Sequence, residues 1–77
     1  MKNDLYYYDI ARENIRYFKK IKGFTYQRIA DETDLSLEYV QQICSLKLQK
    51  TFSLAVLGRI ADVLDVPIYE MLQERKD

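Results

Sequence analysis

The segment Thr25–Ser45, TYQRIADETDLSLEYVQQICS, contains two short helix signals in succession. Thr25 is a residue type that caps a helix N-terminus, and the apolar pair IA follows on one face of the helix it would begin. Asp34 tolerates the left-handed backbone of a sharp turn, and Ser36 is a second helix cap. The segment therefore predicts two helices joined by a turn of about three to four residues, which is a helix-turn-helix.

The second helix of this motif has an inward and an outward face. Val40 and Ile43 are its inward apolar positions. In a helix-turn-helix the second helix usually lies in the DNA major groove, where Gln reads adenine, Glu accepts from cytosine and Leu contacts the thymine methyl. The outward positions, which are the candidate base readers, are Leu37, Glu38, Gln41 and Gln42. A merely solvated polar face would show the same residues, so the pattern by itself leaves both interpretations open.

Helical patterns on both sides of the motif predict an all-α domain. A stripe from Ile10 to Ile21 indicates a helix over residues 9–22, with the basic side chains off the stripe, and Gly23 is placed to end it. Ser53 begins a further helix, and Pro67 precedes a short last one. We predict five helices in one domain, 9–77, after an N-terminal arm formed by residues 1–8. The expected core is Ile15, Phe18, Phe24, Ile29, Ala30, Leu35, Val40, Ile43, Leu54, Leu57, Ile60, Ala61 and Leu64.

Composition argues against several functional classes. The chain has 77 residues, two Gly and one Pro, which suits one small helical domain. It has no His, and Cys44 is its only cysteine, so we expect no catalytic site, no metal site and no cofactor. No stretch approaches the ~20 apolar residues of a membrane span. We therefore expect a cytoplasmic protein without a membrane partner or a small-molecule ligand.

The formal net charge is zero, but the charges are unevenly distributed. Residues 9–22 carry five cations and two anions, whereas residues 51–77 carry three cations and five anions. Residues 26–45 hold one cation, Arg28, against four anions. Acidic side chains near phosphates weaken DNA binding, so a single domain of this kind is expected to bind weakly and two copies to bind better. Arg28 is placed either to face phosphate or to pair with Glu32 one turn on.

The order of these features resembles the helix-turn-helix domain of phage repressor and Cro/C1-type regulators, the Xre-like family, over about residues 10–73. That family has an apolar-Arg start, Gly-apolar-Thr before the second helix, Ser-x-x-Tyr-apolar in the third, and a final Leu-rich helix pair. The matching residues are Ile15, Arg16, Phe18, Lys19, Gly23, Phe24, Thr25, Ile29, Ala30, Leu35, Ser36, Tyr39, Val40 and Ile43. The resemblance implies a five-helix repressor-like fold and a bacterial or phage origin.

Three positions depart from the family pattern. Tyr26 stands where the family has Gln, and Asp34 stands where it has Gly. Cys44 stands where some members have a Glu that pairs with a basic residue at the position of Lys19. Because that pair cannot form here, Lys19 is expected to face solvent or phosphate. The lysines at the end of this first helix are equally compatible with a solvated helix end.

The resemblance also implies functional roles. It predicts a sequence-specific DNA-binding transcription regulator, a repressor that acts as a homodimer on a two-fold site in double-stranded DNA. The expected phosphate contacts are Tyr26, Gln27, Ser36, Tyr39, Lys47 and Lys50. The expected dimer interface is Ile68, Tyr69, Met71 and Leu72. The rival hypothesis is a protein-interaction module or antitoxin-like partner with little DNA binding, which the neutral net charge and the acidic segment 26–45 favour.

Overall fold

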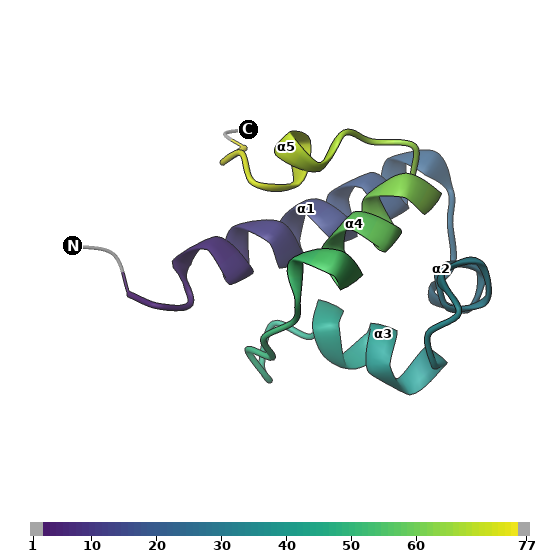
Figure 1. The fold of residues 1–77 in the computed structure, drawn as a ribbon, viewed down its shortest axis with the longest axis horizontal. Helices are drawn as coiled ribbons and strands as arrows, with labels where there is room; N and C mark the ends of the chain where they lie inside the picture. Colours follow the sequence, from purple (N-terminus) through teal and green to yellow (C-terminus); the bar gives the residue numbers. More distant parts are fainter. Residues whose placement is uncertain (1–2, 76–77) are drawn as a thin grey trace.

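In the computed structural model, residues 3–75 are described, and they form α-helices and connecting segments without a β-strand (Figure 1). The helices are α1 (Tyr6–Lys22), α2 (Tyr26–Thr33), α3 (Leu37–Cys44), α4 (Leu54–Val63) and α5 (Ile68–Met71). The all-α prediction is confirmed for this part of the chain. The short loops follow from the scarcity of Gly and Pro in the sequence.

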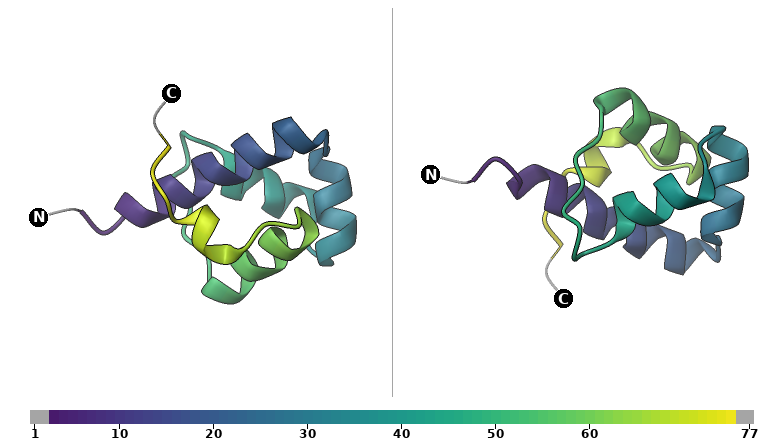
Figure 2. Two further views of the ribbon diagram at one scale, coloured as in Figure 1. Left: turned by 90° about the horizontal axis from the view of Figure 1, so that it is seen from above. Right: turned by 90° about the horizontal axis from the view of Figure 1, so that it is seen from below.

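The long helix α1 runs through the middle of the molecule and contacts α3, α4 and α5 (Figures 1 and 2). In the view of Figure 1, α3 lies below α1 and α5 lies above it. The short helix α2 stands at the end opposite the N-terminus and packs against α3 and α4. Because α1 is covered on several sides, its buried surface is wider than a single apolar stripe.

The helix ends form where the sequence places capping residues. Gly23 has φ 72°, and Asp34 has φ 66°, so both helices that precede them end in a left-handed residue. The side chains of Thr25 and Ser36 each accept a hydrogen bond from the amide three residues on, at 3.0 Å. Ser53 caps α4 in the same way, at 3.1 Å. These caps satisfy amides that have no partner inside the helix.

The beginning of α1 differs from the prediction. The helix starts at Tyr6, three residues before the expected Asp9, so the three consecutive tyrosines are helical and not part of an arm. Tyr8 packs edge-on against Phe52, with ring centroids 5.2 Å apart. Residues 1 and 2 of the expected arm lie outside the described residues. Burial of an aromatic side chain against the loop before α4 supplies the packing that extends this helix.

The core contains most of the expected side chains, with three corrections. Leu54, expected inside, is 69 % exposed, and Ile21, expected on the buried stripe, is 57 % exposed. Arg12, expected off the stripe, is fully buried. Phe24 and Leu35 are only partly buried but pack against the core. The buried side chains outside the expected core list, besides Arg12, are Ile10, Ala11, Asn14, Thr33, Cys44, Phe52, Val66 and Met71.

Candidate nucleic-acid interface

The turn between α2 and α3 is rigid at both ends. Thr33 at the end of α2 donates its hydroxyl proton to the carbonyl of Ile29 at 2.6 Å, and the Leu35 amide donates back to Ala30 at 3.1 Å. Leu35 itself packs partly buried against the core. The Ser36 cap then starts α3 at once. Two short helices are thus held in a fixed mutual orientation by hydrogen bonds and packing.

The outer face of α3 is polar, as the spacing indicated. Val40 and Ile43 are completely buried, whereas Glu38 and Gln41 are exposed. Leu37 and Gln42 are half-buried, and Leu37 packs partly against the core. Glu38 and Gln41 are therefore the most accessible of the four candidate base readers. The two half-buried residues lie at the edges of the same face.

The candidate phosphate-binding side chains do not form a single row. Gln27 is exposed, but its amide donates to Asp31 Oδ1 at 2.8 Å along its own helix. The Ser36 hydroxyl accepts the capping hydrogen bond from the Tyr39 amide, and Ser36 itself is exposed at the start of α3. Lys47 and Lys50 are exposed in the loop after α3.

Cations contact aromatic side chains on both flanks of the α2–α3 pair. Lys19 Nζ lies 4.2 Å from the centre of the Tyr26 ring, and Lys50 Nζ lies 5.8 Å from the centre of the half-buried Tyr39 ring. Arg16 donates to the Tyr26 hydroxyl at 3.4 Å. Burial raises the pKa of Tyr26 above its ordinary value, so this ring stays neutral beside the two cations. These cations, Arg16 and Lys19 from α1 and Lys50 from the loop, form a basic border beside the α2–α3 pair.

The single cation of segment 26–45 is paired. Arg28 Nε lies 2.6 Å from Glu32 Oε2, and its guanidinium stacks over the Phe24 ring at 3.9 Å. Of the two alternatives for Arg28, the intrahelical pair is the one observed. The acidic side chains Asp31 and Asp34 are exposed on α2 and its turn. Negative charge is therefore carried by α2, beside the less acidic outer face of α3.

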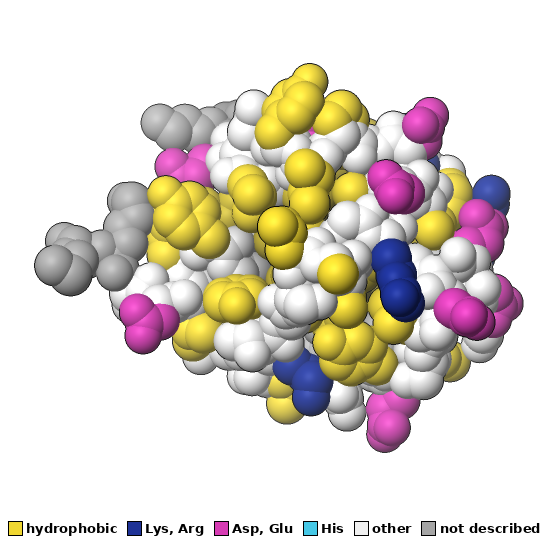
Figure 3. Space-filling view, in the orientation of Figure 1, with side chains coloured by type: hydrophobic (Ala, Val, Ile, Leu, Met, Phe, Trp, Pro, Cys, Tyr) yellow, Lys and Arg dark blue, Asp and Glu magenta, His cyan; other side chains and the backbone are white. Residues whose placement is uncertain are grey.

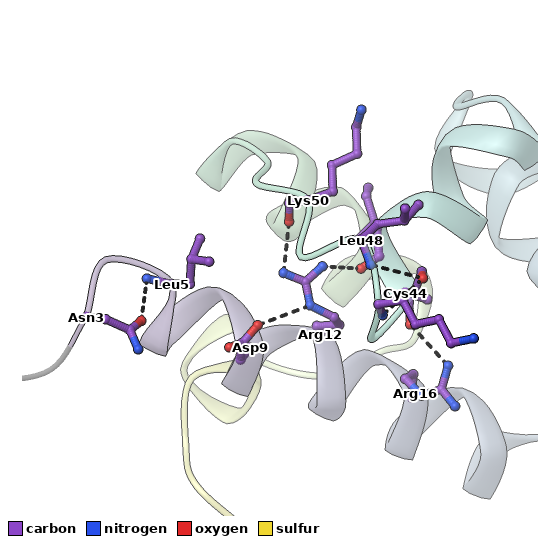
Figure 4. Close-up of polar contacts among 11 residues, drawn as sticks. Asn3, Leu5, Asp9, Arg12, Arg16, Cys44, Leu48 and Lys50 are labelled. Carbon is purple, nitrogen blue, oxygen red and sulfur yellow. Dashed lines mark hydrogen bonds and ion pairs between the residues drawn. The ribbon is translucent and has the colours of Figure 1, made fainter.

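Two arginines of α1 hold the C-terminal end of α3, which the stripe analysis missed (Figure 4). Arg12 donates to the carbonyl of Ile43 at 2.6 Å and to the carbonyl of Lys50 at 2.9 Å. Arg16 donates to the carbonyl of Cys44 at 3.0 Å. The last carbonyls of a helix lack partners inside it and carry its negative dipole end, so guanidinium groups stabilise them. The sequence signal that could have indicated these contacts is the spacing of four residues between Arg12 and Arg16, which places both side chains on one face of the helix.

The side chain of Cys44, the last residue of α3, is buried. Burial raises the pKa of the thiol to about 11, against opposing contributions from the neighbouring cations. A neutral thiol suits this position, since it packs as a small apolar group. Lys19, expected to face solvent or phosphate, is half-buried, and its Nζ lies over the Tyr26 ring.

The expected dimer interface needs one correction. Met71 is fully buried, because its side chain completes the core between α1 and α4, so it is not available to a partner. Tyr69 is 61 % exposed, whereas Ile68 and Leu72 are 37 % and 38 % exposed. Figure 3 shows hydrophobic side chains across the face that carries α5, α4 and the start of α1. A hollow of about 160 Å³ on this face is lined by Tyr7, Tyr8, Ala11, Phe52, Ser53, Leu54, Leu57 and Leu72.

Other kinds of site receive no structural support within residues 3–75. No group of His, Cys, Asp or Glu there is arranged to hold a metal ion. No helix in the described range is long and apolar enough to cross a membrane. Comparisons with protein families, with curated proteins and with solved structures found no match.

Proposed function

We propose that this protein is a sequence-specific DNA-binding transcription regulator of the repressor type, with α2 and α3 as a helix-turn-helix and α3 as its reading helix. The observation that carries the proposal is the outer face of α3. Glu38 and Gln41 are exposed there on a helix whose other side is anchored by Val40 and Ile43. Side chains on a rigid helix with free amide and carboxylate groups suit base-edge contacts in a major groove.

The basic border supports the same function. Lys19 and Arg16 lie beside the start of α2 and the end of α3, and Lys50 lies beside Tyr39. Cations on both flanks of a reading helix are placed to meet the two phosphate backbones that border a groove. The acidic side chains of α2 oppose binding, so affinity from one domain is low. We therefore propose a homodimer, which doubles the number of contacts on a two-fold site.

Selection of random duplexes by the purified protein at two salt concentrations tests this function directly. A preferred sequence should emerge, and the logarithm of affinity should fall steeply with the logarithm of salt concentration. Gln41→Ala should cost ~1–3 kcal/mol on the preferred site and little on random DNA. Gln73→Ala is the matched control, because it removes an exposed side-chain amide after α5, outside the proposed DNA-binding surface. Equal losses on both duplexes would remove Gln41 from the base readers.

The dimer is tested by sedimentation and by half-site binding. Tyr69→Lys places a charge on the exposed apolar face, and it should weaken self-association without unfolding the domain, because Tyr69 is 61 % exposed. Binding to a two-fold site should weaken in parallel, while binding to a half-site stays constant. A monomeric wild type that binds a half-site as well as a two-fold site would contradict the homodimer.

A protein-interaction module is the second candidate. The acidic outer surface of α2 favours it, since Arg28 is neutralised by Glu32 and the remaining charges there are negative. The same salt experiment separates the two functions. Absence of duplex binding at low salt would favour the interaction module, because counterion release makes low salt the most permissive condition for a DNA-binding protein.

A further inference from the structure

Arg12 is a buried cation that the helix-turn-helix itself does not require. Its guanidinium is fully buried beneath the loop that follows α3, and its Cζ lies 6.0 Å from the Phe52 ring centre. Its Nε lies 3.5 Å from Asp9 Oδ1 and makes no hydrogen bond. Removing such a charge from water is costly, and the compensation comes from the Asp9 carboxylate and from the groups that Nη1 and Nη2 bind.

Those two groups belong to different parts of the proposed interface. Nη1 binds the carbonyl of Ile43, in the last turn of α3, and Nη2 binds the carbonyl of Lys50, in the loop that carries the exposed lysines. Figure 4 shows the Arg12 guanidinium beside the carbonyl of Lys50. A guanidinium is planar, and its two Nη atoms are held at a fixed separation. The position of the loop relative to α3 is therefore set through one rigid group.

We propose that Arg12 is a positioning residue that fixes the phosphate-binding loop, residues 45–53, against the base-reading helix. This inference rests on the proposed DNA-binding function. Gln41 can meet a base edge only while the loop lysines meet the backbone in a matching register. Arg12 sets that register from beneath, without contacting DNA. Loss of the second hydrogen bond lets the loop move relative to α3, so the protein loses discrimination between sequences more than it loses attraction to DNA.

The other side-chain hydrogen bonds of this loop are longer and more exposed than the one from Arg12 to Lys50. The Ser45 hydroxyl accepts from the amides of Lys47 and Leu48 at 3.3 and 3.4 Å, both exposed to solvent. Arg16 reaches only the carbonyl of Cys44 and no part of the loop beyond it. The far end of the loop is held to the interior by the buried Phe52 side chain, and Arg12 is the side chain that holds the loop backbone by a hydrogen bond, two residues before Phe52.

Arg12→Lys is the test, since it keeps the positive charge but supplies one compact ammonium in place of a fork. The ratio of affinity for the selected site to affinity for random DNA should fall about 10-fold or more, with affinity for random DNA changed less than ~3-fold. Lys20→Arg is the matched control, because it exchanges the same two residue types at an exposed position on the same helix, and it should change the ratio less than ~3-fold. An unchanged ratio in Arg12→Lys, with a wild type that discriminates normally, overturns the proposal.

Amide hydrogen exchange separates positioning from general stability. In Arg12→Lys, the amides of Ser45, Lys47 and Leu48 should exchange about 10-fold faster, while that of Ile29 in α2 keeps its wild-type rate. A uniform increase across α2 and the loop means that Arg12 only stabilises the fold, and it overturns the proposal. A wild type that binds no duplex refutes the DNA-binding function, and the exchange measurement still decides whether Arg12 fixes the loop.

The wild-type protein supplies a measurement that no unstable variant can confound. Two carbonyls held by one guanidinium hinder its rotation, so Nη1 and Nη2 of Arg12 should give separate nitrogen resonances, with couplings across the hydrogen bonds to Ile43 and Lys50. Arg16, which is exposed, should give an averaged signal. An averaged signal for Arg12 overturns the proposal.

Discussion

Helix α1 holds a different part of the chain on each of two sides, with a charged side chain on one and a neutral one on the other. Towards α3, Arg12 donates to the carbonyls of Ile43 and Lys50. Towards α5, the amide of the buried Asn14 donates to the carbonyls of Met71 and Gln73, at 2.8 and 2.9 Å. Each side chain bridges the end of a short helix and the segment that follows it.

The difference lies in how each bridge is completed. Asn14 Oδ1 accepts from Arg75 at 2.6 Å, so its acceptor is satisfied as well as its donor group. The tail gains a further contact where the Tyr6 hydroxyl donates to Glu74, which raises the pKa of Tyr6 to about 12. Arg12 leaves Nε without a hydrogen bond. On the α5 side, both the donor group and the acceptor of Asn14 are therefore hydrogen-bonded, whereas on the α3 side the buried Arg12 keeps one donor without a hydrogen bond.

Arg12→Met should have the largest effect on stability. The variant keeps most of the apolar stem but removes both donors, so the buried carbonyl of Ile43 and the carbonyl of the exposed Lys50 lose this partner. We expect the free energy of unfolding to fall by about 3–5 kcal/mol, a large part of the stability of so small a domain. Urea unfolding measures the loss, with the exposed Lys20→Met on the same helix as the control. A loss below ~1 kcal/mol would mean that water satisfies these carbonyls when the arginine is absent.

Asn14→Leu should cost less and act locally. It removes two donors and one acceptor at a site where the tail is short and close to solvent, so we expect a loss of about 2–3 kcal/mol. Amide exchange should accelerate in α5, and the DNA selectivity that we propose for α3 should stay constant. Faster exchange in α3 than in α5 would show that the two sides of α1 are coupled and would remove the distinction drawn above.

The sequence predicted the parts of the fold that local chemistry decides. The caps at Thr25, Ser36 and Ser53 and the left-handed Asp34 follow from single residue types, and the structure has each of them. The intrahelical pair of Arg28 and Glu32 was one of two alternatives, because spacing alone cannot decide whether a charge meets its neighbour or a ligand.

The errors arose where a residue's environment depends on distant segments. A helical stripe assigns one buried face, but α1 is covered by three helices, so Arg12 and Asn14 are buried next to the stripe. Ile21 and Leu54 fit the apolar period, yet each lies near a helix end that no other element covers. Met71 was expected at the surface because a four-residue helix has little capacity to bury side chains. Its side chain fills the space between α1 and α4 instead.

The outward positions of α3 were predictable from spacing, but their accessibility was not. Glu38 and Gln41 are exposed, whereas Leu37 and Gln42 are half-buried at the edges of the face. The contacts that Arg12 and Arg16 make with the end of α3 were missed in the sequence, since their acceptors are carbonyl groups about thirty residues away. Backbone acceptors carry no residue signature, so side chains that bind them escape motif analysis.

The pH dependence of stability tests how dry the α3 side of α1 is. Burial raises the pKa of Cys44 from 9.0, the value of a thiol in water, to about 11 in the folded protein. The folded state therefore favours the neutral thiol. Its stabilising contribution is complete below pH 9.0, and it is lost as pH rises towards 11. The stability difference between wild type and Cys44→Ala should shrink by about 2 kcal/mol over that window. A constant difference would mean that water reaches the thiol.

Arg16→Met should have the smallest effect and isolates burial as the cause of the Arg12 effect. Arg16 also donates to a carbonyl at the end of α3, but it is exposed, so water can replace the guanidinium when the donor is removed. We therefore expect the free energy of unfolding to fall by less than about 1 kcal/mol. Added salt should change this small loss little, because the carbonyl carries no full charge.

Urea unfolding of Arg12→Met, Arg16→Met and the double variant measures the coupling between the two sites. A double variant equal to the sum of the single losses means that each arginine holds its own carbonyls independently. A much smaller loss would show that α3 is already released from α1 when Arg12 alone is removed.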